Sequence, residues 1–155
     1  MPPEQTPAER SGEQGPDKLS LLVFSGTFER VHYALVLASA AAAIGKPATL
    51  FFTDRALRAL LSADAQGAPG WRSLSAAEGV SGGAVDDDFR GRGVAGFEEL
   101  LSACVDLGVR FIACEMGLRA MRLQASALRS DLPIEVAGVV TFLGDASALG
   151  AMLVL

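Results

Sequence analysis

The chain has 155 residues, half of them hydrophobic, and its 13 Lys and Arg residues against 18 Asp and Glu give a formal net charge of −5. This length fits one domain with one hydrophobic core. An acidic chain whose basic residues are scattered is a poor candidate for binding nucleic acid or an anionic membrane. The longest apolar run, residues 33–44, has 12 residues, whereas a membrane-spanning helix needs about 20, so no span is expected.

The first 17 residues are polar and Pro-rich. They contain no periodic apolar pattern, so they are predicted to form a disordered tail. They also lack the apolar core of a signal peptide, so a cytoplasmic location is expected. The two cysteines of the chain are therefore expected to be free thiols.

Residues 18–155 are predicted to form a single domain, because apolar runs typical of buried strands alternate with helical patterns. The predicted strands are residues 19–25, 48–53, 109–113, 135–140 and 152–155. The predicted helices are residues 28–44, 55–61, 97–107, 116–123 and 146–151. This order predicts a three-layer α/β/α sandwich with a mostly parallel sheet of about five strands.

Two segments depart from simple alternation. The helix over 28–44, which Thr27 is expected to cap, is apolar on nearly all sides and should pack against more than its own sheet, which favours a homo-oligomer. Residues 62–96 are rich in Gly, Ser, Ala and Asp and are longer than an ordinary loop. We expect this variable loop to be a mobile lid or to contain a helix, with 74–78 as the candidate.

Cys114 is the sharpest candidate for chemistry. It lies between a predicted strand and a predicted helix, at the carboxyl edge of the sheet where ligands bind in such folds. A helix N-terminus stabilises a thiolate, whereas the adjacent carboxylate of Glu115 opposes one. Gly117 is expected to leave room for a substrate or partner. The competing interpretation is a buried, inert cysteine at a strand end.

Cys104 is predicted to be a core residue, because Leu100, Cys104 and Leu107 share one face of their helix. The helix runs antiparallel to the following strand, so Cys104 lies near its amino end and Cys114 beyond its carboxyl end. Their Cα atoms should be about 10 Å apart or more, beyond the limit of roughly 7 Å for a disulfide. Cys104 is therefore not expected to resolve Cys114.

Three other features carry weaker signals. His32 is the only histidine and is more typical of a packing or interface residue than of a catalytic one. Residues 86–88 are three aspartates without the spaced oxygen ligands of a calcium loop, so a solvated acidic loop is expected. The turn formed by Ser25, Gly26 and Thr27 could hold a phosphate at a helix N-terminus, although it lacks the glycine-rich nucleotide motifs. No metal site and no cofactor are expected.

Three stretches carry a resemblance to a known family: LVFSGTFERVHYALVLASAAAAIGKPATLFFT, LLSACVDLGVRFIACEMGLRAM and VAGVVTFLGDASALGAMLVL. The chain resembles the DsrE/DsrF-like family, in the peroxiredoxin-like branch of small sulfur-relay proteins. The resemblance implies a small oligomeric α/β fold, compatible with a trimer-based assembly, in which Cys114 carries a persulfide. Met116 and Met121 fit the pattern of the branch, whereas Gly117 and Arg122 depart from it.

Three functions remain open from the sequence. The first is a sulfur carrier or sulfurtransferase-type protein that relays a persulfide on Cys114 between a donor and an acceptor protein. The second is a non-catalytic oligomeric module that binds a small ligand, and the third is a thiol peroxidase, which the lack of a resolving cysteine disfavours. The candidate binding residues beside Cys114 are Ser25, Gly26, Thr27, Thr53, Met116 and Gly117.

Overall fold

The computed structural model describes residues 15–155, which form a five-stranded sheet with the strand order β4-β3-β2-β1-β5. Every pairing in the sheet is parallel. The strands are β1 (Leu19–Val23), β2 (Ala48–Phe52), β3 (Arg110–Cys114), β4 (Ile134–Ala137) and β5 (Ala151–Val154). The predicted parallel sheet and its number of strands are confirmed.

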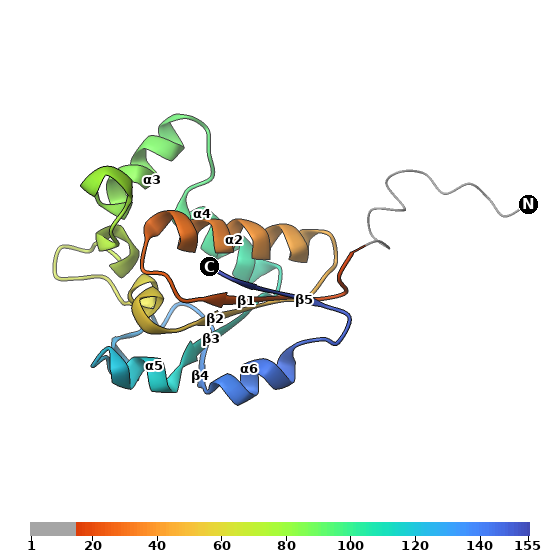
Figure 1. Cartoon of the computed structure of the whole chain (residues 1–155). Coiled ribbons are helices and arrows are strands. Elements are labelled where there is room, and N and C mark those ends of the chain that lie inside the picture. The colour runs from red at the N-terminus through yellow and green to blue at the C-terminus, as the bar shows by residue number, and fades with distance from the viewer. Residues whose placement is uncertain (1–14) are drawn as a thin grey trace, which may run out of the picture.

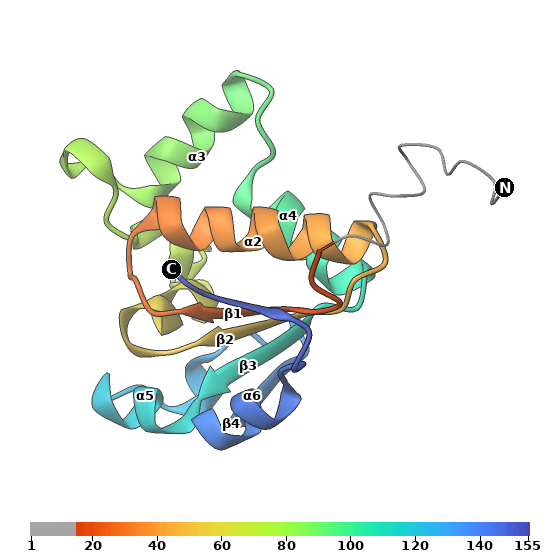
Figure 2. The ribbon, with the colours of Figure 1, turned by 45° about the vertical axis from the view of Figure 1, so that its right-hand side comes forward.

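Helices cover both faces of the sheet, as the three-layer prediction requires. The helices are α2 (Phe28–Ala43), α3 (Gly82–Gly91), α4 (Phe97–Asp106), α5 (Glu115–Ala120) and α6 (Val139–Asp145). Short 3₁₀ helices are η1 (Asp54–Leu60), η2 (Gly70–Ser73), η3 (Ala77–Gly79) and η4 (Ala125–Ala127). The first three α-helices lie on one side of the sheet, and α5 and α6 lie on the other (Figures 1 and 2).

Side chains alternate between the two faces along each strand, so the sheet has two cores. The larger core lies under α2 and α4 and contains Leu21, Leu50 and Phe111, all fully buried. The smaller core lies on the α6 side and consists of Phe51, Ile112, Cys114 and Phe142. Cys114 therefore faces the thinly covered side of the sheet.

The end of the chain folds differently from the prediction. The predicted strand over 135–140 is wrong in its second half, because β4 ends at Ala137 and α6 begins after the N-cap Gly138. The helix predicted over 146–151 is also wrong, because α6 ends at Asp145 and these residues form the turn that leads into β5 at Ala151. Val139 and Val140 are β-branched and favour a strand, but burial of Phe142 against the sheet outweighs that local preference.

The ion pairs of Asp145 hold the end of α6 against the sheet. Its carboxylate lies 2.8 Å from Lys18 Nζ and 2.8 Å from Arg110 Nη1, and it accepts a hydrogen bond of 2.6 Å from Thr49 Oγ1. Burial raises the pKa of Asp145, but the hydrogen bonds from Lys18, Thr49 and Arg110 outweigh it and leave the pKa below its usual range. These contacts of Asp145 join the end of α6 to β2, to β3 and to the residue just before β1.

The variable loop contains a helix, but at a different place from the candidate over 74–78. That helix is α3, and the Ser81 side chain caps it by accepting a hydrogen bond from the Ala84 backbone at 3.2 Å. Two glycines open α3, which hid it in the sequence. Gly82 is needed there because a Cβ would come within 2.8 Å of both the Phe28 ring and the Trp71 carbonyl oxygen.

The three aspartates lie on α3, so the expected acidic loop is a helix. Asp86 is 3 % exposed and accepts a hydrogen bond of 2.6 Å from the Phe97 backbone, which fixes the start of α4. Asp87 and Asp88 form ion pairs with arginines, among them Arg90 and Arg92. Among residues 15–155 no group of three His, Cys, Asp or Glu side chains could hold a metal ion.

The N-terminal tail and the membrane-spanning potential of the chain were also subjects of the sequence predictions. Residues 1–14 of the predicted tail lie outside the described residues, and residues 15–17 run beside α2, where Lys46 Nζ donates to the Pro16 carbonyl at 2.7 Å. Within residues 15–155, no helix has the length and apolar character to cross a bilayer.

Candidate functional site

The carboxyl ends of β1, β2 and β3 bring three candidate loops to one edge of the sheet. Val23 pairs with Phe52, and Phe52 pairs with Ala113. The residues that follow these positions therefore lie side by side in space. This edge is where parallel α/β sheets bind their ligands.

Cys114 is both the last residue of β3 and the N-cap of α5. Its Sγ accepts a hydrogen bond of 3.3 Å from the Gly117 backbone N–H. The thiol sulfur thus takes the place of a capping oxygen at the start of α5. Glu115 is turned outward to an ion pair of 2.8 Å with Arg119, which offsets the carboxylate that the sequence places beside the thiol.

The Cys114 side chain is nearly enclosed. It is 3 % exposed and shares the smaller core with Phe51, Ile112 and Phe142. The Phe51 and Phe142 rings stack with their centroids 4.7 Å apart. Among the described residues, α6 is the one helix that supplies a buried side chain, Phe142, to this core.

Gly117 is close-packed and leaves no open space for a substrate. A Cβ at this position would lie 2.7 Å from Thr53 Oγ1 and 3.0 Å from the Asp54 backbone nitrogen. The glycine therefore lets α5 pack against the β2–η1 turn, which places Thr53 next to the helix that Cys114 caps. Met116, by contrast, is 72 % exposed directly beside Cys114.

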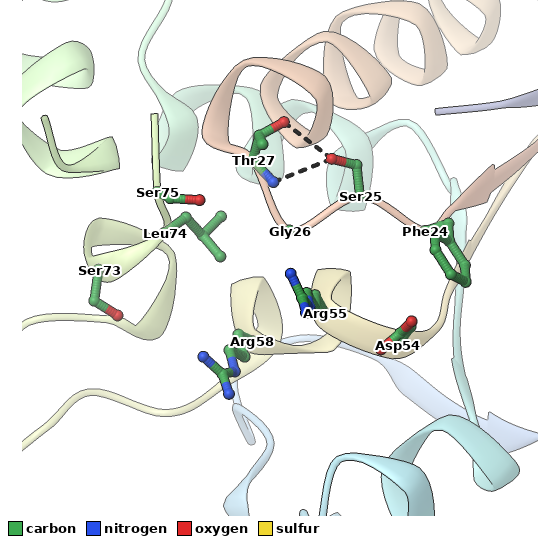
Figure 3. A pocket seen from close by; sticks show the side chains of 10 residues that line it. All are labelled: Phe24, Ser25, Gly26, Thr27, Asp54, Arg55, Arg58, Ser73, Leu74 and Ser75. Atoms are coloured by element: carbon green, nitrogen blue, oxygen red, sulfur yellow. Dashed lines mark hydrogen bonds between the residues drawn. The ribbon is translucent and has the colours of Figure 1, made fainter. Parts of the chain in front are cut away.

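The other three candidate binding residues line a separate cavity of about 750 Å³ one strand away (Figure 3). Ser25, Gly26 and Thr27 form one wall. The Ser25 and Thr27 hydroxyl oxygens are 3.0 Å apart, and Ser25 Oγ also accepts a hydrogen bond from the Thr27 backbone. Thr27 is the N-cap of α2, as expected, but its hydroxyl makes no capping hydrogen bond to the helix. The candidate residues are thus split between the packed surroundings of Cys114 and this cavity.

The opposite wall of the cavity carries two arginines that the sequence interpretation missed. Arg55 and Arg58 project from η1 toward the loop of Ser25 to Thr27 and toward residues 73–75 (Figure 3). A 3₁₀ helix has three residues per turn, so residues three apart lie on the same face. The usable signal was the spacing R-x-x-R directly after a buried strand.

Cys104 is the packing residue that the sequence predicts. It is fully buried, and its Sγ lies 3.7 Å from the Leu35 carbonyl oxygen. Burial raises the pKa of the Cys104 thiol to about 12, so this thiol is protonated at neutral pH. Both cysteines are free, and no disulfide joins them, as expected.

His32 lies in an aromatic cluster away from Cys114. It is 5 % exposed, its Nε2 lies 2.9 Å from the Ala95 carbonyl oxygen, and its ring packs edge-on against Phe89. It faces the larger core, on the opposite side of the sheet from the thiol. It therefore connects α2 to the α3–α4 segment and does not form a Cys–His pair.

These elements together define a parallel α/β sheet in which a single cysteine caps the helix that follows β3. Residues 72–153, more than half of the chain, match the DsrE/DsrF/DrsH-like family. The chain therefore belongs to this family. The sulfur carrier protein DsrE2 of Allochromatium vinosum is 29 % identical over 118 residues, which cover 64 % of this chain and 74 % of that protein. The expected family is confirmed.

Proposed function

We propose that this protein is a sulfur carrier that holds sulfane sulfur on Cys114. The observation that carries the proposal is the position of Cys114, whose sulfur caps α5 and accepts a hydrogen bond from Gly117. The thiolate is the form of a cysteine that attacks sulfur. The similarity to a protein named as a sulfur carrier supports the same function.

The proposed sulfur transfer needs no oxidant or reductant besides the donor persulfide and the acceptor thiol. The Cys114 thiolate attacks the outer sulfur of a donor persulfide R–S–SH, its S–S bond breaks, and the donor leaves as a thiolate R–S⁻. The product is Cys114–S–SH. An acceptor thiolate then attacks the outer sulfur and releases the Cys114 thiolate, as in thiol–disulfide exchange.

A single-thiol cycle fits the rest of the chain. Cys104 is buried on the other face of the sheet and protonated at neutral pH, so it does not supply a second reacting thiol. Two free thiols also suit the reducing cytoplasm, where the proposal locates the protein. The sulfur donor and acceptor are proposed to be partner proteins.

The surface around the thiol supports a binding face for other chains. Large apolar side chains on the α6 side of the sheet remain exposed: Phe24, Met116, Val140, Leu143, Met152 and Val154. Such a patch marks an interaction site. We expect a homo-oligomer that uses part of this face, with multi-angle light scattering giving a mass above one chain, and a monomer at micromolar concentration would contradict this expectation.

The test is to incubate the reduced protein with a persulfide donor and to map the added sulfur mass by peptide mass spectrometry. A gain of one sulfur on the peptide that contains Cys114 is expected. Cys114→Ser should abolish the gain, and the matched variant Cys104→Ser should retain it. Sulfur that still adds to Cys114→Ser would refute the proposal.

The ligand-binding module is the second candidate, and the burial of Cys114 favours it. At 3 % exposure the thiol is poorly placed to meet a donor unless α6 moves. A protein that never acquires sulfur, yet binds a small molecule in the cavity beside Ser25, would support this alternative. The mass measurement of sulfur on Cys114 therefore distinguishes the sulfur carrier from the ligand-binding module.

A further inference from the structure

The cavity lined by Ser25, Thr27, Arg55 and Arg58 has no part in the thiol chemistry proposed above. Its volume of about 750 Å³ lies within the range of about 300–1,000 Å³ that is typical of small-molecule sites. Cys114 does not line it. The η1 helix lies between the two places, since its Leu57 contacts the position of Gly117 while its arginines face the cavity.

The charge of the cavity is dominated by two cations without partners. Among residues 15–155, neither Arg55 nor Arg58 forms an ion pair or a side-chain hydrogen bond, in contrast to Arg72, Arg90 and Arg110. Asp54 lies at the other end of the cavity, near Phe24 (Figure 3). Two guanidinium groups on successive turns of one 3₁₀ face offer up to ten N–H donors, roughly five each, to one ligand group.

The opposite wall adds further donors. The start of α2, a helix of 16 residues, lies directly behind Thr27, so its partial positive charge is close to the cavity wall. The hydroxyl groups of Ser25, Thr27 and Ser75 are on this side (Figure 3). Ser25 and Thr27 already bond to each other, so the main donors for a ligand are the two guanidinium groups, whose two charges suit a dianionic oxoanion better than a singly charged carboxylate.

The close approach of the two walls is built into the backbone. A Cβ on Gly26 would come within 2.6 Å of Arg55 Cβ, so glycine is required where the β1–α2 loop passes η1. Phe24, which is 52 % exposed, supplies apolar surface at the end of the cavity that also carries Asp54, whereas Leu74 lies at the other end and is 3 % exposed (Figure 3). The cavity therefore offers two guanidinium groups and one exposed aromatic ring.

We propose that this cavity binds a small organic molecule with a dianionic phosphate-type headgroup. The headgroup lies against the guanidinium groups of Arg55 and Arg58, and the loop of Ser25 to Thr27 borders the same cavity. The organic part lies against the exposed ring of Phe24. Binding does not depend on sulfur transfer by Cys114, so either proposal can fail without the other.

The test is calorimetric titration of the full chain with phenyl phosphate, inorganic phosphate, benzenesulfonate and benzoate at fixed ionic strength. Phenyl phosphate should bind most tightly and should weaken as NaCl rises, because the contacts are charged. The double substitution R55Q/R58Q should reduce its affinity about tenfold or more, since two charge-assisted hydrogen-bonding groups are lost. Arg92→Gln is the matched control, since Arg92 is an exposed arginine at the C-cap of α3, paired with Asp88, and it should leave the affinity unchanged.

Four results would overturn the proposal. If phenyl phosphate at millimolar concentration gives no heat of binding, the cavity is not a binding site for this class of ligand. If benzoate binds as tightly as phenyl phosphate, the cavity does not recognise a phosphate-type dianion. If inorganic phosphate binds as tightly as phenyl phosphate, the organic part of the ligand contributes nothing to binding. A double variant that folds, as circular dichroism shows, but binds like the parent protein would place the ligand elsewhere.

Discussion

Phe142→Ala should make Cys114 react faster with a thiol reagent, by about tenfold or more, while lowering the free energy of unfolding by about 3 kcal/mol. The stability cost follows from deleting a fully buried aromatic side chain. The faster reaction follows because Phe142 is the residue through which α6 closes the core around Cys114. A tenfold increase in rate needs a decrease of only about 1.4 kcal/mol in the free energy of local opening.

The measurement is the rate of modification by a maleimide, in a Cys104→Ser background so that one thiol reports. Phe111→Ala is the matched control, because Phe111 is equally buried but belongs to the larger core on the other face of the sheet. It should cost similar stability and leave the labelling rate in native conditions much closer to that of the parent. Equal acceleration in both variants would mean that global unfolding, rather than α6, controls access to Cys114.

Asp145→Asn should lower the free energy of unfolding by about 2 kcal/mol at pH 7, because three partners lose a charged acceptor in a half-buried place. The pKa of Asp145 is lowered in the folded state, where hydrogen bonds from Lys18, Thr49 and Arg110 outweigh burial. Its contribution is therefore fully present above the unfolded-state pKa of about 3.9 and is lost as pH falls through the lower folded-state value.

The difference in unfolding free energy between the parent and Asp145→Asn should consequently narrow as pH falls below about 4, because the unfolded parent chain then begins to bind a proton at Asp145 before the folded protein does. Urea unfolding at pH 7 and at pH 3 measures it. The control is Glu115→Gln, which breaks an exposed pair with Arg119 and should change stability by about 0.5 kcal/mol or less. A gap for Asp145→Asn that is constant with pH would contradict the role of its charge.

The sheet was predictable because its central strands are continuous apolar runs. All five residues of β2 are buried, and only a strand covered on both faces has that pattern. The place of Cys114 at a strand end and the isolation of Cys104 followed from counting residues along elements of known rise. Local patterns were sufficient for these features because neighbouring parallel strands end at the same edge.

Features decided by contacts distant in the sequence were not predictable. Val139 and Val140 favour a strand locally, and only the packing of Phe142 on the sheet makes this segment helical. The space beside Gly117 was expected to be open, but Thr53 fills it from another loop. The enclosure of the thiol and the two arginines of the cavity likewise depend on how η1 and α6 dock, which no local pattern encodes.

The edge position of β5 has a consequence for how the chain is completed during synthesis. β5 pairs with β1, and the lysine just before β1 binds a residue 127 positions later. While the polypeptide is still emerging, β1 is an unprotected outer strand, and the apolar side chains beneath it meet water. Contacts of such long range form slowly, and unpaired strand edges invite misassembly in the meantime. Nascent chains that have not yet added β5 are therefore the ones that most need a chaperone.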